Sequence, residues 1–197
     1  MRKTPDWHHQ THLERRRLAI SLTESPIEAL FAGELATSPS FGVCRTKPPQ
    51  EEFSRGRIAL VPQQPAGRFR IDIAAFLLDQ NGKFHQIAIE CDGHAWHSSP
   101  AQIARDTRRD EWLVAAGWCV WRYRGWAIHH HWADAVDEAE EAIRNLAVDN
   151  PVCHLWASSV NGQEPDRAKA ARMYLERADD YERITGNRIE RREHGDD

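Results

Sequence analysis

The clearest pattern in the chain is a pair of apolar stretches separated by a short polar turn. Residues 68–78 and 83–91 are rich in Ile, Ala and Phe, and Gln80, Asn81 and Gly82 lie between them. An Asn-Gly pair between two apolar runs is typical of a β-hairpin. The pattern therefore predicts two antiparallel strands over these residues.

Helical periodicity and turn signals predict the elements on either side of this hairpin. Ser25 and Pro26 suit the N-cap and the first position of a helix, and Gly117 suits the end of another. We expect helices over 11–35 with a break at Ser25, 100–116, 134–146 and 166–185, and further strands over 58–61 and 118–123. A helix that connects two strands of one sheet favours a right-handed crossover between parallel strands. The expected fold is α/β: a mixed four-stranded sheet flanked by helices, with an extra helix near the C-terminus.

The length of the hairpin loop decides whether two acidic side chains meet. Asp72 and Glu90 interrupt the otherwise apolar strands. A two-residue loop would place Asp72 opposite Cys91 and turn Glu90 to the other face, because opposite residues share a face. A three-residue loop with a left-handed Gly82 shifts the pairing by one residue and places Asp72 opposite Glu90. If both acids serve one metal ion, the second register is predicted.

These acids have a catalytic and a structural interpretation. A buried carboxylate is costly unless a cation compensates its charge. Asp92 and two histidines follow Glu90 at a strand end, where α/β proteins tend to carry their chemistry. Oxygen ligands there would suit Mg²⁺, which keeps waters that can act as nucleophiles. In the structural alternative, Asp72 pairs with Arg70 or Arg124, and Glu90 is a surface acid.

Charge is distributed unevenly along the chain. The net charge is −4, with 22 Arg and 4 Lys. Residues 1–125 carry 17 Lys and Arg against 14 Asp and Glu, whereas residues 126–197 carry 9 against 16. Arg suits bidentate phosphate contacts, and it suits surface ion pairs equally well. A net negative charge is unusual for a protein that holds nucleic acid by itself.

The cysteines and the apolar runs bear on zinc binding, membrane insertion and location. The four cysteines form no CxxC pair, so a cysteine zinc site is not expected. No stretch approaches the roughly 20 apolar residues of a membrane span, and the first residues are polar. The sequence predicts reduced thiols, no membrane partner and a cytoplasmic location.

Four segments carry a family resemblance. They are residues 25–28 (SPIE), 70–72 (RID), 89–97 (IECDGHAWH) and 104–123, which contains ARDTRRD and AGWCVWRY. In this order and spacing the chain resembles the PD-(D/E)XK nuclease superfamily, in the branch of very-short-patch-repair endonucleases and their endonuclease-like relatives. The resemblance implies a restriction-endonuclease-like core that hydrolyses phosphodiester bonds with a metal-activated water. DNA is the implied substrate, ahead of RNA.

The resemblance also implies roles for residues of the site. Asp72 and Glu90 are the acidic metal ligands, and the backbone carbonyl of Cys91 completes the strand-end set. Glu28 matches the helix glutamate that many members add to the site. His97 matches a histidine that acts as general acid or base near the scissile phosphate. The implied ion is Mg²⁺ or Mn²⁺.

One position departs from the superfamily pattern. Asp92 stands where the superfamily has a lysine, and an aspartate cannot stabilise charge as a cation. Asp92 still counts among the candidate catalytic residues, and the general base is His97 or a metal-bound water. A catalytically inactive nuclease fold that binds nucleic acid or protein is therefore the alternative function.

Nucleic-acid contacts are expected around this site. Arg105 or Arg109, on the helix beside it, would bind phosphate or brace an acid, and Arg70 would add a contact. Trp96 would stack on a base or wedge into a duplex; alternatively, it packs over the hairpin.

The chain divides into three predicted parts. Residues 1–24 form a helical extension, residues 25–148 the nuclease-like core, and residues 149–197 a linker with an amphipathic helix and an acidic end. Tyr174 and Tyr181 lie on the apolar side of that last helix, which docks on the core or on a protein partner. Within the core, three consecutive histidines at 129–131 are expected in a solvated loop before its last helix.

Overall fold

The protein is built on one central β-sheet with helices packed on its faces. The computed structural model describes residues 5–92, 100–145, 152–153 and 183. Its strands are β1 (Phe41–Val43), β2 (Ile58–Ala66), β3 (Phe69–Leu78), β4 (Phe84–Asp92), β5 (Cys119–Arg124) and β6 (Val152–Cys153). Its helices are α1 (His12–Leu22), α2 (Pro26–Leu35), α3 (Pro100–Ala115) and α4 (Gly125–Asn145), with short 3-10 turns η1 (Asp6–His8) and η2 (Gln50–Glu52). The strands form one sheet in the order β1-β2-β3-β4-β5-β6.

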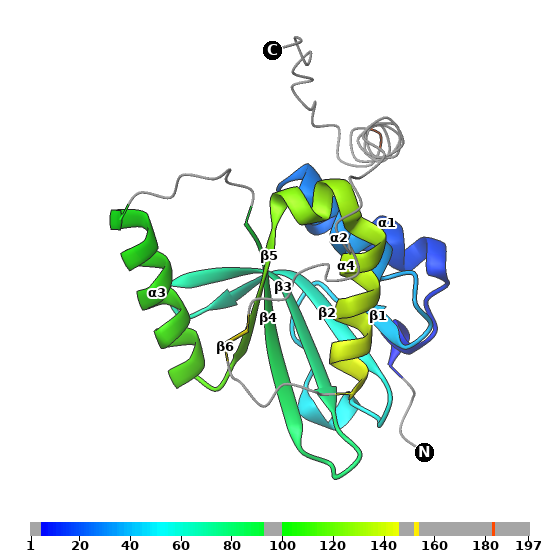
Figure 1. The fold of residues 1–197 in the computed structure, drawn as a ribbon. Helices are drawn as coiled ribbons and strands as arrows, with labels where there is room; N and C mark the ends of the chain where they lie inside the picture. The colour runs from blue at the N-terminus through cyan, green and yellow to red at the C-terminus, as the bar shows by residue number, and fades with distance from the viewer. Residues whose placement is uncertain (1–4, 93–99, 146–151, 154–182, 184–197) are drawn as a thin grey trace.

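The helices lie on both faces of this sheet (Figure 1). On one face α2 and α4 pack together, with α1 against α2, and α3 lies on the other side. Each face buries its own apolar cluster. Phe31, Ile89 and Ile128 belong to the cluster under α2 and α4, whereas Phe76 and Leu113 belong to the cluster under α3. The expected α/β class is therefore confirmed.

The β3–β4 hairpin has the register predicted for a three-residue loop. Ala74 pairs with Ala88, and Phe76 pairs with Gln86. Gly82 has a φ of 82°, the left-handed conformation that the loop requires. This register carries the acidic ends of both strands to the same edge of the sheet.

The crossover after the hairpin also follows the prediction. Strand β4 leads through α3 into β5, and β5 pairs parallel to β4. In that register Glu90 lies beside Arg122, and Asp92 lies beside Arg124. Strand β5 therefore brings basic side chains next to the acids of β4.

The sheet is larger than the four strands that the sequence indicates. Phe41, Gly42 and Val43 pair parallel to β2, in a segment where the sequence predicts no strand. A three-residue strand is too short to show a periodic pattern. Strand β6 pairs parallel to β5 in the same way. The prediction of a four-stranded sheet was wrong because both short strands escape pattern analysis.

The three histidines were also placed in the wrong kind of segment. Helix α4 starts at Gly125, so His129, His130 and His131 lie within it, with a kink at His131 (φ −137°). Ala127 and Ile128 are buried, and their burial draws this turn into the core. The three histidines are half-buried rather than solvated. The predicted C-terminal helix, with Tyr174 and Tyr181, lies outside the described residues.

Candidate active site

Asp72 and Glu90 meet at the edge of the hairpin. The last recorded pair toward this edge is Ile73 with Ile89, and the two acids follow next on their strands. The Asp72 Oδ2 accepts a hydrogen bond from the Cys91 N–H over 2.8 Å. The Glu90 side chain is only 1% exposed. The alternative reading of Glu90 as a surface acid is therefore wrong.

Both carboxyl groups hold their protons more tightly than usual. Burial, with a smaller contribution from the charge of Glu28, raises the pKa of Asp72 to about 6, although the hydrogen bond from the Cys91 N–H opposes the shift. Burial, followed by the charge of Asp72, raises the pKa of Glu90 to about 8. Nearby arginines lower both values without reversing either shift. The pair thus has more negative charge than its surroundings compensate.

Glu28 approaches from α2, where the predicted cap is formed. Ser25 is the N-cap and Pro26 occupies the first turn. The Ser25 hydroxyl donates to Glu28 Oε1 over 2.8 Å, and the Glu24 N–H donates to Oε2 over 3.1 Å. The Gln63 side-chain amide donates to the same Oε2 over 2.6 Å. These three bonds use three of the roughly four acceptor sites of the carboxylate, so Glu28 keeps one site, on Oε1, for an ion.

Gln63 is a residue of the site that sequence reasoning missed. It lies between Pro62 and Gln64, which pair with Ile73 and Ile71, so it stands level with Asp72. Its φ is +56°, a left-handed conformation that is uncommon outside glycine. This local distortion of β2 accompanies the bond from Gln63 to Glu28. Sequence gave no signal for it beyond a polar residue inside a strand.

Arg109 of α3 is the cation in contact with Glu90. Its Nη2 lies 2.5 Å from Glu90 Oε2 and also donates to the Arg70 carbonyl over 2.6 Å. The expectation that Arg105 or Arg109 braces an acid is met by Arg109. Arg105 is exposed on the same helix. The Arg70 side chain pairs with Glu24, so it is not the partner of the acidic pair.

Asp92, in the position of the superfamily lysine, is held by Arg122. Arg122 Nη1 donates to Asp92 over 2.7 Å, and its Nε and Nη2 donate to both oxygens of Asp110 over 3.0 and 2.6 Å. Burial lowers the pKa of Arg122, but the hydrogen bond to Asp110 and the two carboxylate charges outweigh it and raise the pKa. Burial raises the pKa of Asp92, and Arg122 opposes that shift. A cation thus stands beside the position where the lysine is missing, on the neighbouring strand.

Arg122 could have been noticed in the sequence. It interrupts the apolar run of β5 in the way that Asp72 and Glu90 interrupt the hairpin strands. Its partner Asp110 could not, because it is one of several charges on α3. His97 and Trp96, both predicted for the site, lie outside the described residues.

The donors present suit a hard divalent cation. Glu90 Oε1 is buried and accepts no hydrogen bond from any described residue. An unpaired buried carboxylate oxygen is costly unless a ligand compensates it. Within the described ranges, no three Asp, Glu, His or Cys side chains form a metal-binding group. Mg²⁺ needs only one or two carboxylates besides water, so Asp72, Glu90 and the Cys91 carbonyl would suffice.

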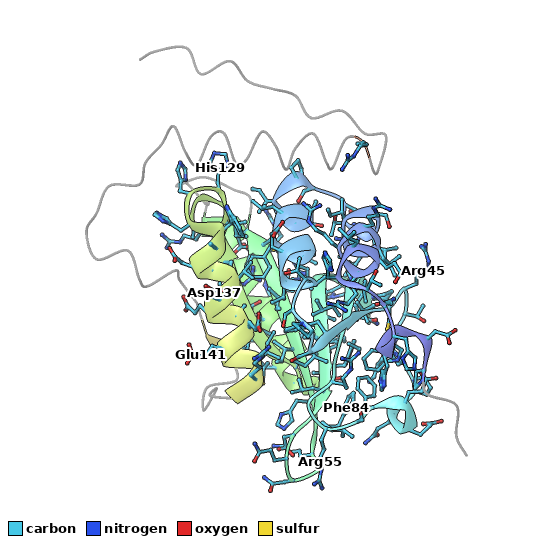
Figure 2. The ribbon with its side chains drawn as sticks, turned by 90° about the vertical axis from the view of Figure 1, so that its right-hand side faces the viewer. Arg45, Arg55, Phe84, His129, Asp137 and Glu141 are labelled. Carbon is cyan, nitrogen blue, oxygen red and sulfur yellow. The ribbon has the colours of Figure 1, made fainter. Side chains whose placement is uncertain are left out.

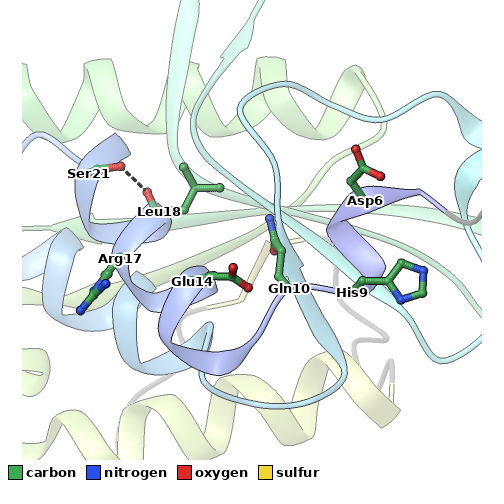
Figure 3. A pocket seen from close by; sticks show the side chains of 7 residues that line it. All are labelled: Asp6, His9, Gln10, Glu14, Arg17, Leu18 and Ser21. Atoms are coloured by element: carbon green, nitrogen blue, oxygen red, sulfur yellow. Dashed lines mark hydrogen bonds between the residues drawn. The ribbon is translucent and has the colours of Figure 1, made fainter.

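A separate pocket of about 690 Å³ lies on η1 and α1 (Figure 3). Its polar groups are largely engaged in structure. Glu14 closes the capping box of α1, Gln10 bonds both backbone groups of Val43, and Ser21 donates to the Leu18 carbonyl. None of the acids at the strand edge (Glu28, Asp72, Glu90, Asp92 and Asp110) lines it. We therefore assign the chemistry to the strand edge.

A mixed sheet with helices on both faces and two acids at adjoining strand ends is the arrangement of a restriction-endonuclease-like nuclease domain. Residues 51–146 match the family model REase_MTES_1575, a restriction-endonuclease-like family. The match supports a restriction-endonuclease-like nuclease domain over these residues, and the matched segment includes every acid of the site except Glu28. No curated protein and no solved structure matches the chain. No described helix has the length and apolar content to cross a bilayer.

Proposed function

We propose that this protein is a divalent-metal-dependent endonuclease that hydrolyses phosphodiester bonds of DNA. The observation that carries the proposal is the buried pair Asp72 and Glu90, with an unpaired oxygen on Glu90, inside a restriction-endonuclease-like domain. A pair of carboxylates whose pKa values are raised by burial and mutual repulsion favours the binding of a cation. Mg²⁺ is the proposed ion, with Mn²⁺ as its substitute.

Each residue of the site has a role in this proposal. Asp72, Glu90 and the Cys91 carbonyl would hold the ion, which when bound would neutralise phosphate charge and make a water more acidic. Arg109 keeps Glu90 Oε2 in place through its ion pair and its anchor on the Arg70 carbonyl. Arg122 holds Asp92 and leaves its own charge next to Glu90. The proposed general base is His97 or a metal-bound water.

Cleavage of supercoiled plasmid tests the proposal. Wild-type protein is assayed with Mg²⁺, with Mn²⁺ and with EDTA, beside Asp72→Asn and Glu90→Gln. We expect cleavage that requires the metal and falls by about 100-fold or more in both variants, because each removes a ligand charge. Both substitutions keep the size of the side chain, so the fold is retained.

Two matched controls remove the same charges elsewhere. Asp137 and Glu141 are exposed on α4 and project away from the sheet (Figure 2). Asp137→Asn and Glu141→Gln should cleave at the wild-type rate. A wild-type protein that cleaves neither DNA nor RNA with either metal would overturn the proposal.

One observation favours a second function. The position where the superfamily has a lysine holds Asp92, whose carboxylate accepts a hydrogen bond from Arg122. An inactive nuclease fold that binds nucleic acid or a protein partner is consistent with this arrangement. Metal-independent DNA binding without cleavage would favour the inactive nuclease fold over the endonuclease. The narrower kinship to very-short-patch-repair endonucleases, the boundaries at 24 and 148, and the cytoplasmic location stay predictions.

A further inference from the structure

An arginine-rich surface lies next to the acidic pair. Arg105, Arg108, Arg109 and Trp112 occupy positions i, i+3, i+4 and i+7 of α3, which form one stripe of a helix. The buried Leu113 and the Arg122-bound Asp110 lie on a neighbouring face of the same helix. Arg105, Arg108 and Trp112 of this stripe are exposed, whereas Arg109 turns toward Glu90.

The β2–β3 turn adjoins this stripe. Trp112 packs edge-on against Phe69, with ring centroids 5.4 Å apart. A Cβ on Gly67, whose φ is 58°, would lie 2.4 Å from Trp112 Cη2, so glycine is needed for this close approach. The turn and the start of β3 also supply two exposed arginines, Arg68 and Arg70. We call Arg68, Phe69, Arg70, Arg105, Arg108 and Trp112 the arginine–tryptophan surface.

Charge on this surface is largely uncompensated by described residues. Arg70 pairs with Glu24. Arg68, Arg105 and Arg108 form no ion pair with a described residue, although Glu111, an exposed acid, follows Arg108 by three residues. Three available cations gather here although the chain carries a net charge of −4. Such a local concentration of Arg is suited to phosphate.

The surface is continuous with the acidic pair through Arg109. Its guanidinium binds Glu90 and lies 6.0 Å from the Phe69 ring centroid, while the Arg68 guanidinium lies 4.9 Å from the same centroid. One aromatic ring therefore contacts both the arginine of the site and an arginine of the surface. A chain of phosphates that reaches Glu90 would pass over this junction.

We propose that the arginine–tryptophan surface binds a single-stranded segment of nucleic acid, with phosphates on its arginines and an unpaired base against Trp112. Trp112 is 36% exposed, one of two large apolar side chains with this much exposure among the described residues. An exposed indole beside arginines can stack on any unpaired base, whereas a duplex hides its base faces. The inference rests on the proposed nuclease function and specifies the form of its substrate near the site.

Fluorescence anisotropy in EDTA tests this proposal without cleavage. The full chain is titrated into labelled oligonucleotides of one sequence: single-stranded DNA, single-stranded RNA and duplex DNA. We expect tighter binding to single strands than to the duplex. The DNA and RNA arms show which sugar is preferred, and equal or tighter binding to the duplex would overturn the proposal.

Variants locate the binding. Trp112→Leu keeps an apolar contact over Gly67 and should weaken single-strand binding about tenfold, close to the loss of one stacked base. Combining Arg68→Ala with Arg108→Ala should lower the slope of log affinity against log salt by about 1.4, because each single-strand phosphate contact contributes about 0.7. Arg17→Ala and Arg55→Ala, exposed arginines on α1 and on the loop before β2, serve as controls.

The outcomes separate this inference from the proposed function. Variants of the surface that match the Arg17 and Arg55 controls would overturn the inference, whatever the plasmid assay gives. Surface-dependent single-strand binding without metal-dependent cleavage would support the inference and overturn the nuclease function. Thermal unfolding of each variant checks that a lost contact, not a lost fold, explains weaker binding.

Discussion

The acids at the two ends of the β3–β4 hairpin have pKa shifts of opposite sign. At the turn, Asp79 accepts the backbone N–H groups of Asn81 and Lys83, each over 2.8 Å, and contacts His85 over 3.0 Å. The hydrogen bond from His85, followed by that from Lys83, lowers the pKa of Asp79. At the other end, burial raises the pKa of Asp72 to about 6. Asp79 accepts two backbone N–H groups of its own turn, whereas Asp72 accepts one backbone N–H, that of Cys91.

The difference follows from what surrounds each carboxylate. Asp79 stands in a loop whose free N–H groups need an acceptor, so its charge organises the turn. Asp72 accepts one strand N–H, that of Cys91, Glu90 Oε1 accepts none from a described residue, and the two acids repel one another. Acids of the first kind build structure, whereas acids of the second kind are suited to an external cation.

The largest expected difference between the two ends is in metal affinity. Asp72→Asn should weaken Mn²⁺ binding by about 10- to 100-fold, because it removes a charged oxygen ligand. Asp79→Asn should leave the affinity unchanged, since the turn lies at the far end of the hairpin. Isothermal titration calorimetry on the metal-free chain measures both. Equal affinities for the wild type and Asp72→Asn would remove Asp72 from the metal site.

The second difference is in the pH dependence of stability without metal. The raised pKa values of Asp72 and Glu90 mean that the folded chain binds these protons more tightly than the unfolded chain, whose carboxyls titrate near pH 4. Their contribution to the free energy of unfolding is therefore lost as pH rises from about 4 to about 8. The pKa shift of Asp79 has the opposite sign. The contribution of Asp79 to the free energy of unfolding is therefore lost as the pH falls through its lowered pKa.

Urea unfolding in EDTA at several pH values measures these signs. At pH 8, Asp72→Asn should unfold with a free energy about 1–2 kcal/mol higher than the wild type, after allowing for a weaker acceptor at Cys91. Asp79→Asn should be less stable than the wild type at pH 8 and approach it in acid. Adding Mg²⁺ at pH 8 should reverse the order of the wild type and Asp72→Asn. A wild type that becomes more stable between pH 5 and pH 8 in EDTA would contradict the assignment.

The smallest expected effect comes from the loop that sets the register. Gly82 has a φ of 82° and nothing within 4 Å of an added Cβ. Gly82→Ala should therefore cost about 1 kcal/mol of conformational strain, with no clash. Metal affinity should stay at the wild-type value because the register is retained. An altered affinity would indicate that the loop slips and separates Asp72 from Glu90.

The fold was predictable where patterns are long and local. The hairpin, its three-residue loop and the crossover through α3 follow from apolar runs and one Asn-Gly pair. The short edge strands β1 and β6 were not predictable, because two or three residues carry no periodicity. The start of α4 was missed because three adjacent histidines obscure its apolar side.

Some residues of the candidate site could likewise be found from the sequence, and others could not. Asp72 and Glu90 were found because a charge inside an apolar strand is conspicuous, and their juxtaposition followed from the loop length. Arg109 was a candidate from the sequence, but Gln63 and Arg122 were not found, because each reaches its acid from another element far along the chain. Gln63 reaches Glu28 across 35 residues, and Arg122 reaches Asp92 across 30.

The sequence by itself therefore determined the hairpin, its register and the pair of acids at one edge, since all three depend on neighbouring residues. The tertiary structure alone decided which charges these acids meet. Whether a buried carboxylate keeps an unpaired oxygen, as Glu90 does, depends on the packing of α3 and β5 around it. Burial and opposing charges act through space, and only the assembled fold fixes the distances over which they act.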